Sequence, residues 1–181
     1  MSPQDSSNDL AAAVFVTGAN VVTILRERGW LAGEPSAAQS AWCERAASLL
    51  GPHAADRVAL SDLLHLVFHY DAHEILAAVE SHSALSRYAA RDVLRHLALL
   101  LLDGAPLTRE HFKEVVEKLK EDLGIRSRDL FHPIRLALTG RVGEGELDRV
   151  ILLLDEAAAL NLAVPVKSAR ERILEFCSAL D

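Results

Sequence analysis

Three histidines, His65, His69 and His73, recur every four residues in the stretch HLVFHYDAH. Side chains four residues apart lie on one face of a helix, and imidazole nitrogens are common ligands of zinc. The pattern could therefore hold a metal ion, provided that a single helix runs through all three histidines.

A helix boundary inside the same stretch offers a second explanation. Asp71 is followed three residues later by Glu74, a pair that is typical of a capping box opening a new helix. A bend at Asp71 takes His73 away from His65 and His69, and two imidazoles alone leave a zinc site incomplete. We therefore expect packing and capping here, and no metal site.

The sequence contains no other pattern that is typical of a catalytic or cofactor site. It has no nucleophile elbow and no paired CxxC, and its two cysteines, Cys43 and Cys177, lie far apart. The glycines of residues 140–146, GRVGEGE, lack a preceding strand and a Lys-Ser/Thr ending, so they predict an ordinary loop. We expect no cofactor, and a reducing cytoplasm as the setting.

Composition limits the class of protein. Of the 181 residues, 50% are hydrophobic and 25% are charged, which is typical of a globular chain. The net charge of −7 argues against binding polyanions over the whole surface, although a local basic patch remains possible. The apolar residues 10–25 include Thr17 and Asn20 and are shorter than the roughly 20 residues that cross a bilayer. They predict a buried helix, with no association with membranes.

Apolar residues recur at helical spacing in nearly every segment, and no segment alternates as a strand does, so the sequence predicts an all-α protein. Gly29 should end the first helix, and Pro35 and Gly51 should bracket the second. Ser61 is a candidate N-cap for the third. Residues 82–104 are the longest predicted helix.

The composition changes at residues 103–107, DGAPL, where we place a boundary between two packed helical subdomains, 1–104 and 105–181. After it, Thr108 and Gly124 should cap the two ends of one helix. Within that helix, Glu114 and Lys118 should form an ion pair four residues apart.

Two further helices are expected near the end of the chain. Pro133 should open a short helix that Gly140 ends, and a loop should follow before the chain becomes helical again near Glu146. The last helix should run from about Pro165 to Leu180.

Residues 130–154, LFHPIRLALTGRVGEGELDRVILLL, resemble the C-terminal anticodon-binding domain of bacterial-type glutamyl-tRNA synthetases. Members of that family carry a Leu-Phe-x-Pro-Leu-Arg-x-Ala-Leu-Thr-Gly run, then a loop and a leucine-rich helix. The residues that match are Leu130, Phe131, Pro133, Arg135, Ala137, Leu138, Thr139 and Gly140. The likeness covers residues 40–181 and is strongest over 105–160.

The resemblance implies an all-helical cage that binds a tRNA anticodon. By that resemblance Arg135 contacts an anticodon base, and Leu147, in the loop GRVGEGEL, packs on an anticodon nucleotide. A guanidinium group can hydrogen-bond or stack on the splayed bases of an RNA loop. The resemblance also places His69 at an aromatic packing position. Gly145 departs from the family, which usually has proline there.

Charge in the same region predicts a local basic patch. Residues 126–141 contain Arg126, Arg128, Arg135 and Arg141, with Asp129 as the only carboxylate. Arginine clustering is the pattern expected for contacts with phosphate.

Each of these residues also has a purely structural explanation. Arg135 could cap a neighbouring helix, Leu147 could belong to the core, and Arg126 and Arg128 could be solvated linker charges.

The family's catalytic domain is recognised by a His-Ile-Gly-His-like motif and a Lys-Met-Ser-Lys-Ser-like loop, and neither is present in this sequence. We expect a noncatalytic module that binds a tRNA resembling tRNA-Glu, free-standing or part of a longer ligase, with a catalytic synthetase as a possible partner. The alternative is a helical protein-interaction adaptor that has lost RNA binding. The acidic net charge and the carboxylates of Glu144 and Glu146 beside the predicted site favour this alternative.

Overall fold

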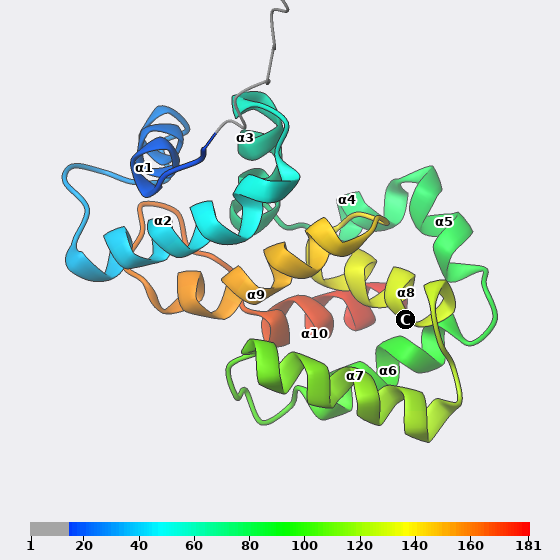
Figure 1. Cartoon of the computed structure of the whole chain (residues 1–181). Coiled ribbons are helices and arrows are strands. Elements are labelled where there is room, and N and C mark those ends of the chain that lie inside the picture. Colours follow the sequence, from blue (N-terminus) through cyan, green and yellow to red (C-terminus); the bar gives the residue numbers. More distant parts are fainter. Residues whose placement is uncertain (1–14) are drawn as a thin grey trace, which may run out of the picture.

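The computed structural model describes residues 15–181, which form helices and no strand, as the sequence predicted (Figure 1). The elements are α1 (Gly18–Glu27), α2 (Ala37–Leu50), the 3₁₀ turn η1 (Gly51–His53), α3 (Arg57–Phe68), α4 (Ala72–Ala77), α5 (Val79–Leu85), α6 (Ala90–Leu100), α7 (Arg109–Leu123), α8 (Arg128–Thr139), α9 (Gly145–Ala159) and α10 (Ala169–Leu180). None of the helices in this described part is both long enough and apolar enough to cross a bilayer.

The first helix begins later than its apolar run suggested. Thr17 accepts a hydrogen bond from the backbone N–H of Asn20, and the Asn20 side chain accepts one in return, so this capping box starts α1 at Gly18. Phe15 precedes the helix and is 88% exposed. The predicted helical residues 10–14 lie outside the described residues.

Two predicted helix boundaries in the first half of the chain are wrong. The cap of α3 is Asp56, which accepts from the N–H of Ala59, and Ser61 lies inside the helix. The single helix predicted over residues 82–104 is two helices, because the backbone at Ala89 adopts a left-handed conformation with φ of 58°. Alanine carries no sequence signal for such a break, since left-handed residues are usually glycine or asparagine.

In the second half, Thr108 and Gly124 cap α7 as predicted. The predicted pair of Glu114 with Lys118 is wrong, because Lys118 pairs with Asp122 at 3.0 Å, one turn in the other direction.

The predicted starts of the two other helices are also wrong. Helix α8 begins at Arg128 and contains Pro133, whose missing N–H leaves the carbonyl of Asp129 without its helical partner. Asp129 is exposed, so water can satisfy that carbonyl. Helix α10 begins at Ala169 because Ser168 and Glu171 form a capping box.

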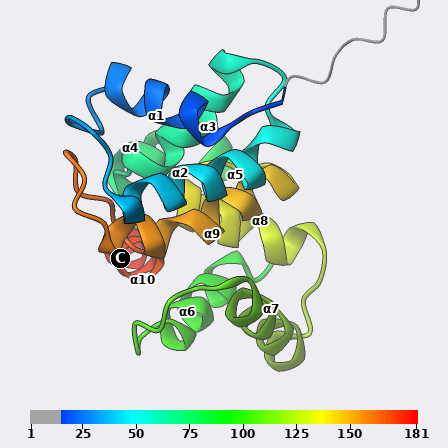
Figure 2. The ribbon, with the colours of Figure 1, turned by 60° about the vertical axis from the view of Figure 1, so that its left-hand side comes forward.

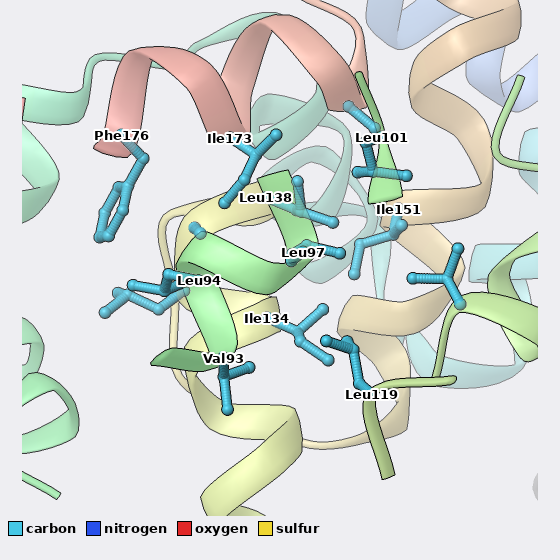
Figure 3. Close-up of a cluster of buried hydrophobic side chains, with 14 of the residues drawn as sticks. Val93, Leu94, Leu97, Leu101, Leu119, Ile134, Leu138, Ile151, Ile173 and Phe176 are labelled. Carbon is cyan, nitrogen blue, oxygen red and sulfur yellow. The ribbon is translucent and has the colours of Figure 1, made fainter. Parts of the chain in front are cut away.

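Helix α9 runs through the middle of the molecule and is buried on several sides. In Figures 1 and 2 it lies between α1, α2 and α3 on one side and α6 and α7 on the other. Its side chains Val150 and Leu154 pack in an N-terminal core with α1 to α3, and Ile151 packs in a C-terminal core with α6, α7, α8 and α10. Figure 3 shows the C-terminal core, where Leu97 and Leu119 lie among the buried side chains. This core continues across residue 104, and the subdomain boundary placed there stays a prediction.

A fully buried arginine ties three helices together. The guanidinium of Arg172 in α10 donates to the carbonyl oxygens of Leu66 and Val67 at the end of α3 and of Leu138 near the end of α8, at 2.8, 2.6 and 3.0 Å. The guanidinium also lies 4.8 Å from the ring centroid of Tyr70. Carbonyl groups at helix C-termini carry partial negative charge, so one cation holds both helix ends in place.

Candidate nucleic-acid interface

The three histidines do not form one cluster. Asp71 caps α4 as predicted, by accepting from the N–H groups of His73 and Glu74, and the chain bends there. The Glu74 carboxylate does not complete the predicted capping box; instead it pairs with the Nε2 of His69 at 2.7 Å. The ring of His69 stacks on that of His65 with centroids 5.1 Å apart. Within residues 15–181 no three His, Cys, Asp or Glu side chains gather in a way that could hold a metal ion.

His65 is the less exposed member of this stacked pair. Its Nδ1 atom is buried without a hydrogen-bond partner in the described part of the protein. Burial lowers the pKa of His65, and the nearby His69, Arg28 and Arg141 lower it further, which favours the neutral imidazole.

The centre of the predicted site is the side chain of Arg135. Its Nε and Nη2 atoms donate to the two carboxylate oxygens of Asp148 at 2.8 and 2.9 Å, and Nη1 donates to the carbonyl of Gly143 at 2.8 Å. The guanidinium also lies 4.8 Å from the ring centroid of Phe131, and the side chain is only 9% exposed. Arg135 therefore joins α8, the loop that follows it and the first turn of α9.

That loop is fixed at its start as well. Gly140 ends α8 with φ of 85°, and its N–H donates to the carbonyl of Leu136. The hydroxyl of Thr139 donates to the carbonyl of Arg135 at 2.7 Å and accepts from the N–H of Arg141 at 3.3 Å. With Gly143 held by Arg135, residues 140–143 have both ends anchored.

The start of α9 is acidic. Glu146 and Asp148 lie in its first turn, where carboxylates are stabilised by the partial positive charge of a helix N-terminus. The Glu144 carboxylate lies 3.9 Å from Nη1 of Arg135 and is exposed. The acidic residues beside the predicted site are thus partly engaged by the helix and by Arg135.

The other arginines of the predicted patch are not together. Arg126 and Arg128 are exposed at the beginning of α8, and Arg141 is exposed just beyond its end. A helix rises 1.5 Å per residue, so the 12 residues of α8 separate the two groups by roughly 18 Å. Leu147 is 3% exposed and packs in the N-terminal core, which leaves its side chain almost no surface for a nucleotide.

A small basic cluster surrounds the beginning of α8. Arg87 reaches from the segment after α5 and pairs with Asp129 at 3.1 Å, which neutralises the one carboxylate of the predicted patch. Burial lowers the pKa of His132, and the charges of Arg87 and Arg135 lower it further. Arg87 and His132 line a cavity of about 310 Å³.

The sequence reasoning missed a second group of cations between α7 and α9. A groove of about 390 Å³ is lined there by Arg109, Lys113 and Lys120 of α7 and by Arg149 of α9. The first three recur at four-residue or seven-residue spacing, which places them on one face of a helix. That spacing was visible in the sequence, but nothing in it indicated that α9 would lie opposite.

The anticodon binding domain family matches residues 19–161. The glutamate–tRNA ligase of Carboxydothermus hydrogenoformans is 31% identical over 102 residues, which are 56% of this chain and 21% of that protein. The glutamate–tRNA ligases of Exiguobacterium sibiricum and Bacillus subtilis are 28% and 26% identical over 142 and 137 residues, about three quarters of this chain and 28% of each ligase. The chain thus spans less than a third of the length of these relatives. No solved structure matches it.

Proposed function

The chain belongs to the anticodon-binding domain family, and from that premise we propose that it is a noncatalytic module that binds the anticodon loop of a tRNA. The relatives named above are glutamate–tRNA ligases, so the tRNA we propose is tRNA-Glu or one that resembles it. We place the activity in the cytoplasm, and we propose that aminoacylation is carried out by a catalytic synthetase domain, in the same chain or a partner.

One observation carries this proposal: the loop after α8 is anchored at both ends. Sequence-specific RNA recognition mostly uses unpaired bases, which need a surface that is already shaped before binding. Arg135 and Thr139 fix residues 140–143 by hydrogen bonds. The loop thereby offers such a surface, and it includes the exposed Arg141.

The predicted site residues have different roles in this proposal. Arg141, Arg126 and Arg128 are exposed and contact phosphates, and Arg141 belongs to the loop itself. Arg135 acts chiefly by holding the loop, and only the 9% of its side chain that is exposed is left to contact a base. Leu147 supports the loop from the N-terminal core.

The alternative function is a protein-interaction adaptor that keeps the helical cage without binding RNA. The net charge of −7 and the exposed Glu144 beside the loop favour it, because both weaken the attraction of phosphate. A direct RNA-binding measurement separates the two functions.

The test is the affinity of the protein for transcribed tRNA-Glu, measured by fluorescence anisotropy across a salt series. The controls are tRNA-Glu with an exchanged anticodon and an unrelated tRNA. We expect preference for the native anticodon, and an affinity that falls as salt rises because phosphate contacts release counterions. Equal weak binding of all three tRNAs would contradict the proposal and support the adaptor.

A matched pair of variants tests the site. Arg141→Ala should weaken binding of tRNA-Glu, whereas Arg91→Ala should not, although it removes the same charge. Arg91 is an exposed residue of α6, far along the chain from the loop. Equal effects of the two substitutions would place the RNA elsewhere on the surface.

A further inference from the structure

The groove between α7 and α9 combines a basic rim with an apolar floor. Arg109, Lys113 and Lys120 lie along one rim on α7, and Arg149 lies on the α9 side. The floor residues are Phe112, Val116, Phe131 and Leu152. Such a surface suits a ligand that has both negative charge and a flat apolar face.

The rim carries free positive charge. Within residues 15–181 no carboxylate forms an ion pair with Arg109, Lys113 or Arg149, and Lys120 pairs only with Glu117 at 3.1 Å. Glu117 and Asp148 also line the groove, but Glu117 pairs with Lys120, and the two carboxylate oxygens of Asp148 are already engaged by Arg135. The chain as a whole has a net charge of −7, so these cations form a local positive region that would attract an anion.

The floor contains an aromatic ring that is held in place. Phe131 is half-buried, and the Arg135 guanidinium stabilises it by a cation–π contact with 4.8 Å to the ring centroid. Aromatic side chains beside a positively charged groove are the usual platform for unpaired bases.

The groove adjoins the loop of the proposed site. Gly145 and Asp148 of the first turn of α9 line it, and Asp148 is the residue that Arg135 holds. A strand of RNA that leaves the loop at residues 140–143 therefore meets this groove next.

We infer that this groove is a second RNA subsite, in which the basic rim binds the phosphates of an unpaired segment and the apolar floor receives one of its bases. The inference rests on the proposed function, and extends it to residues of α7 and to Arg149. It adds an α7 contribution to a site that the sequence placed entirely in residues 126–147.

The chemistry of the groove favours RNA over an acidic protein helix as the occupant. The aromatic ring beside the cations offers a base a surface to stack on, and the groove borders the loop that we propose binds the anticodon.

The test compares two double variants of equal charge by anisotropy with transcribed tRNA-Glu. Lys113→Ala/Arg149→Ala removes two rim cations, and Lys118→Ala/Arg91→Ala removes two cations outside the groove. We expect the rim variant to bind at least about tenfold more weakly, with its logarithmic salt slope reduced by about 1.4, since each contact with single-stranded RNA contributes about 0.7. The control variant should stay within about twofold of the wild-type protein.

A third variant tests the floor. Phe131→Leu keeps an apolar side chain but removes the aromatic face, and should weaken binding of an unpaired RNA heptamer about fivefold or more, which corresponds to the lower end of base stacking on aromatic side chains. Thermal unfolding of each variant, followed by circular dichroism, shows whether the fold is retained; where Phe131→Leu is destabilised, Phe131→Tyr should restore affinity.

The outcomes separate the two proposals. Wild-type affinity in the rim variant, together with weak binding by Arg141→Ala, would overturn the subsite and leave the proposed function standing. No binding of tRNA by the wild-type protein would overturn both. A fluorescent oligoglutamate peptide tests the acidic-protein alternative. If the peptide binds the wild-type protein but not the rim variant, and neither tRNA nor the heptamer displaces it, the groove binds an acidic protein instead.

Discussion

The guanidinium of Arg135 and the carboxylate of Asp148 form two parallel hydrogen bonds of 2.8 and 2.9 Å between α8 and the first turn of α9. The side chains are 9% and 24% exposed, so water screens the pair little. A two-point contact of this kind fixes orientation as well as distance. It therefore determines how the loop between the two helices is presented.

Breaking this pair should cost much more stability than breaking a surface pair. We expect Asp148→Ala to lower the free energy of unfolding by about 3 kcal/mol, because the buried guanidinium loses its partner. Urea denaturation measures this change.

The matched control for that substitution is an exposed ion pair. Arg45 and Glu156 pair at 2.7 Å with both side chains more than two fifths exposed, and Glu156→Ala should cost less than about 1 kcal/mol. The double variant Arg135→Met/Asp148→Ala should lose about 1–3 kcal/mol less than the sum of its single variants, because contacting residues couple. Additive losses would show that the pair does not hold the loop.

Alanine substitutions at two glycines distinguish the cost of backbone strain from the cost of steric crowding. Gly124 and Gly140 both end helices with positive φ, of 64° and 85°. A Cβ atom at Gly124 would meet nothing within 4 Å, whereas at Gly140 it would lie 3.1 Å from the side chain of Ile75. We expect Gly124→Ala to cost about 1 kcal/mol from left-handed strain alone, and Gly140→Ala to cost more. Equal losses in thermal unfolding would mean that Ile75 moves freely.

Removing the guanidinium of Arg172 should strongly destabilise the packing of α3, α8 and α10 against one another. Arg172→Leu leaves the carbonyl groups of Leu66, Val67 and Leu138 buried without a donor, and each costs about 1–3 kcal/mol. We expect a total loss of at least about 3 kcal/mol in denaturant unfolding.

Arg172→Lys provides the comparison for that substitution. Lysine keeps the charge but cannot donate in the planar fork of a guanidinium, so it should recover only part of the lost stability. Full stability of Arg172→Leu would contradict a structural role for this arginine.

The free energy of unfolding should decrease in mild acid, because two histidines resist protonation in the folded protein. Burial lowers the pKa of His65 and His132 below the value of about 6.5 that histidine has in an unfolded chain. Below pH 6.5 the unfolded chain therefore takes up protons that the folded chain resists. The contribution is complete above that pH and is lost as the pH falls toward the folded-state pKa values.

The measurement is the free energy of unfolding from pH 8 to pH 5 in the wild-type protein and in His65→Phe. Phenylalanine cannot be protonated and keeps an aromatic ring beside Trp30 and His69. We expect a flatter pH dependence in the variant. An unchanged slope would show that protonation of His65 costs the folded state nothing.

Local sequence signals predicted much of the helical pattern. Thr108, Gly124, Asp71 and Gly140 cap helices where the sequence placed them, because caps act through hydrogen bonds within about four residues. The same locality explains the failure at Ala89, since no neighbouring residue encodes its left-handed backbone. The break at Ala89 starts α6 afresh, and the side chains of Val93, Leu94 and Leu97 in α6 are fully buried in the C-terminal core.

By itself, then, the sequence determined the all-α class, several helix caps and the family motif in residues 130–140. Only the tertiary structure decided what the motif's side chains contact. It turned Arg135 toward Asp148, buried Leu147 in the N-terminal core, and separated Arg126 from Arg141 along α8. Periodicity tells which residues share a helix face, but the helix opposite that face depends on interhelical angles that the whole core sets. For that reason the groove between α7 and α9 could not be predicted from the sequence and is visible only in the tertiary structure.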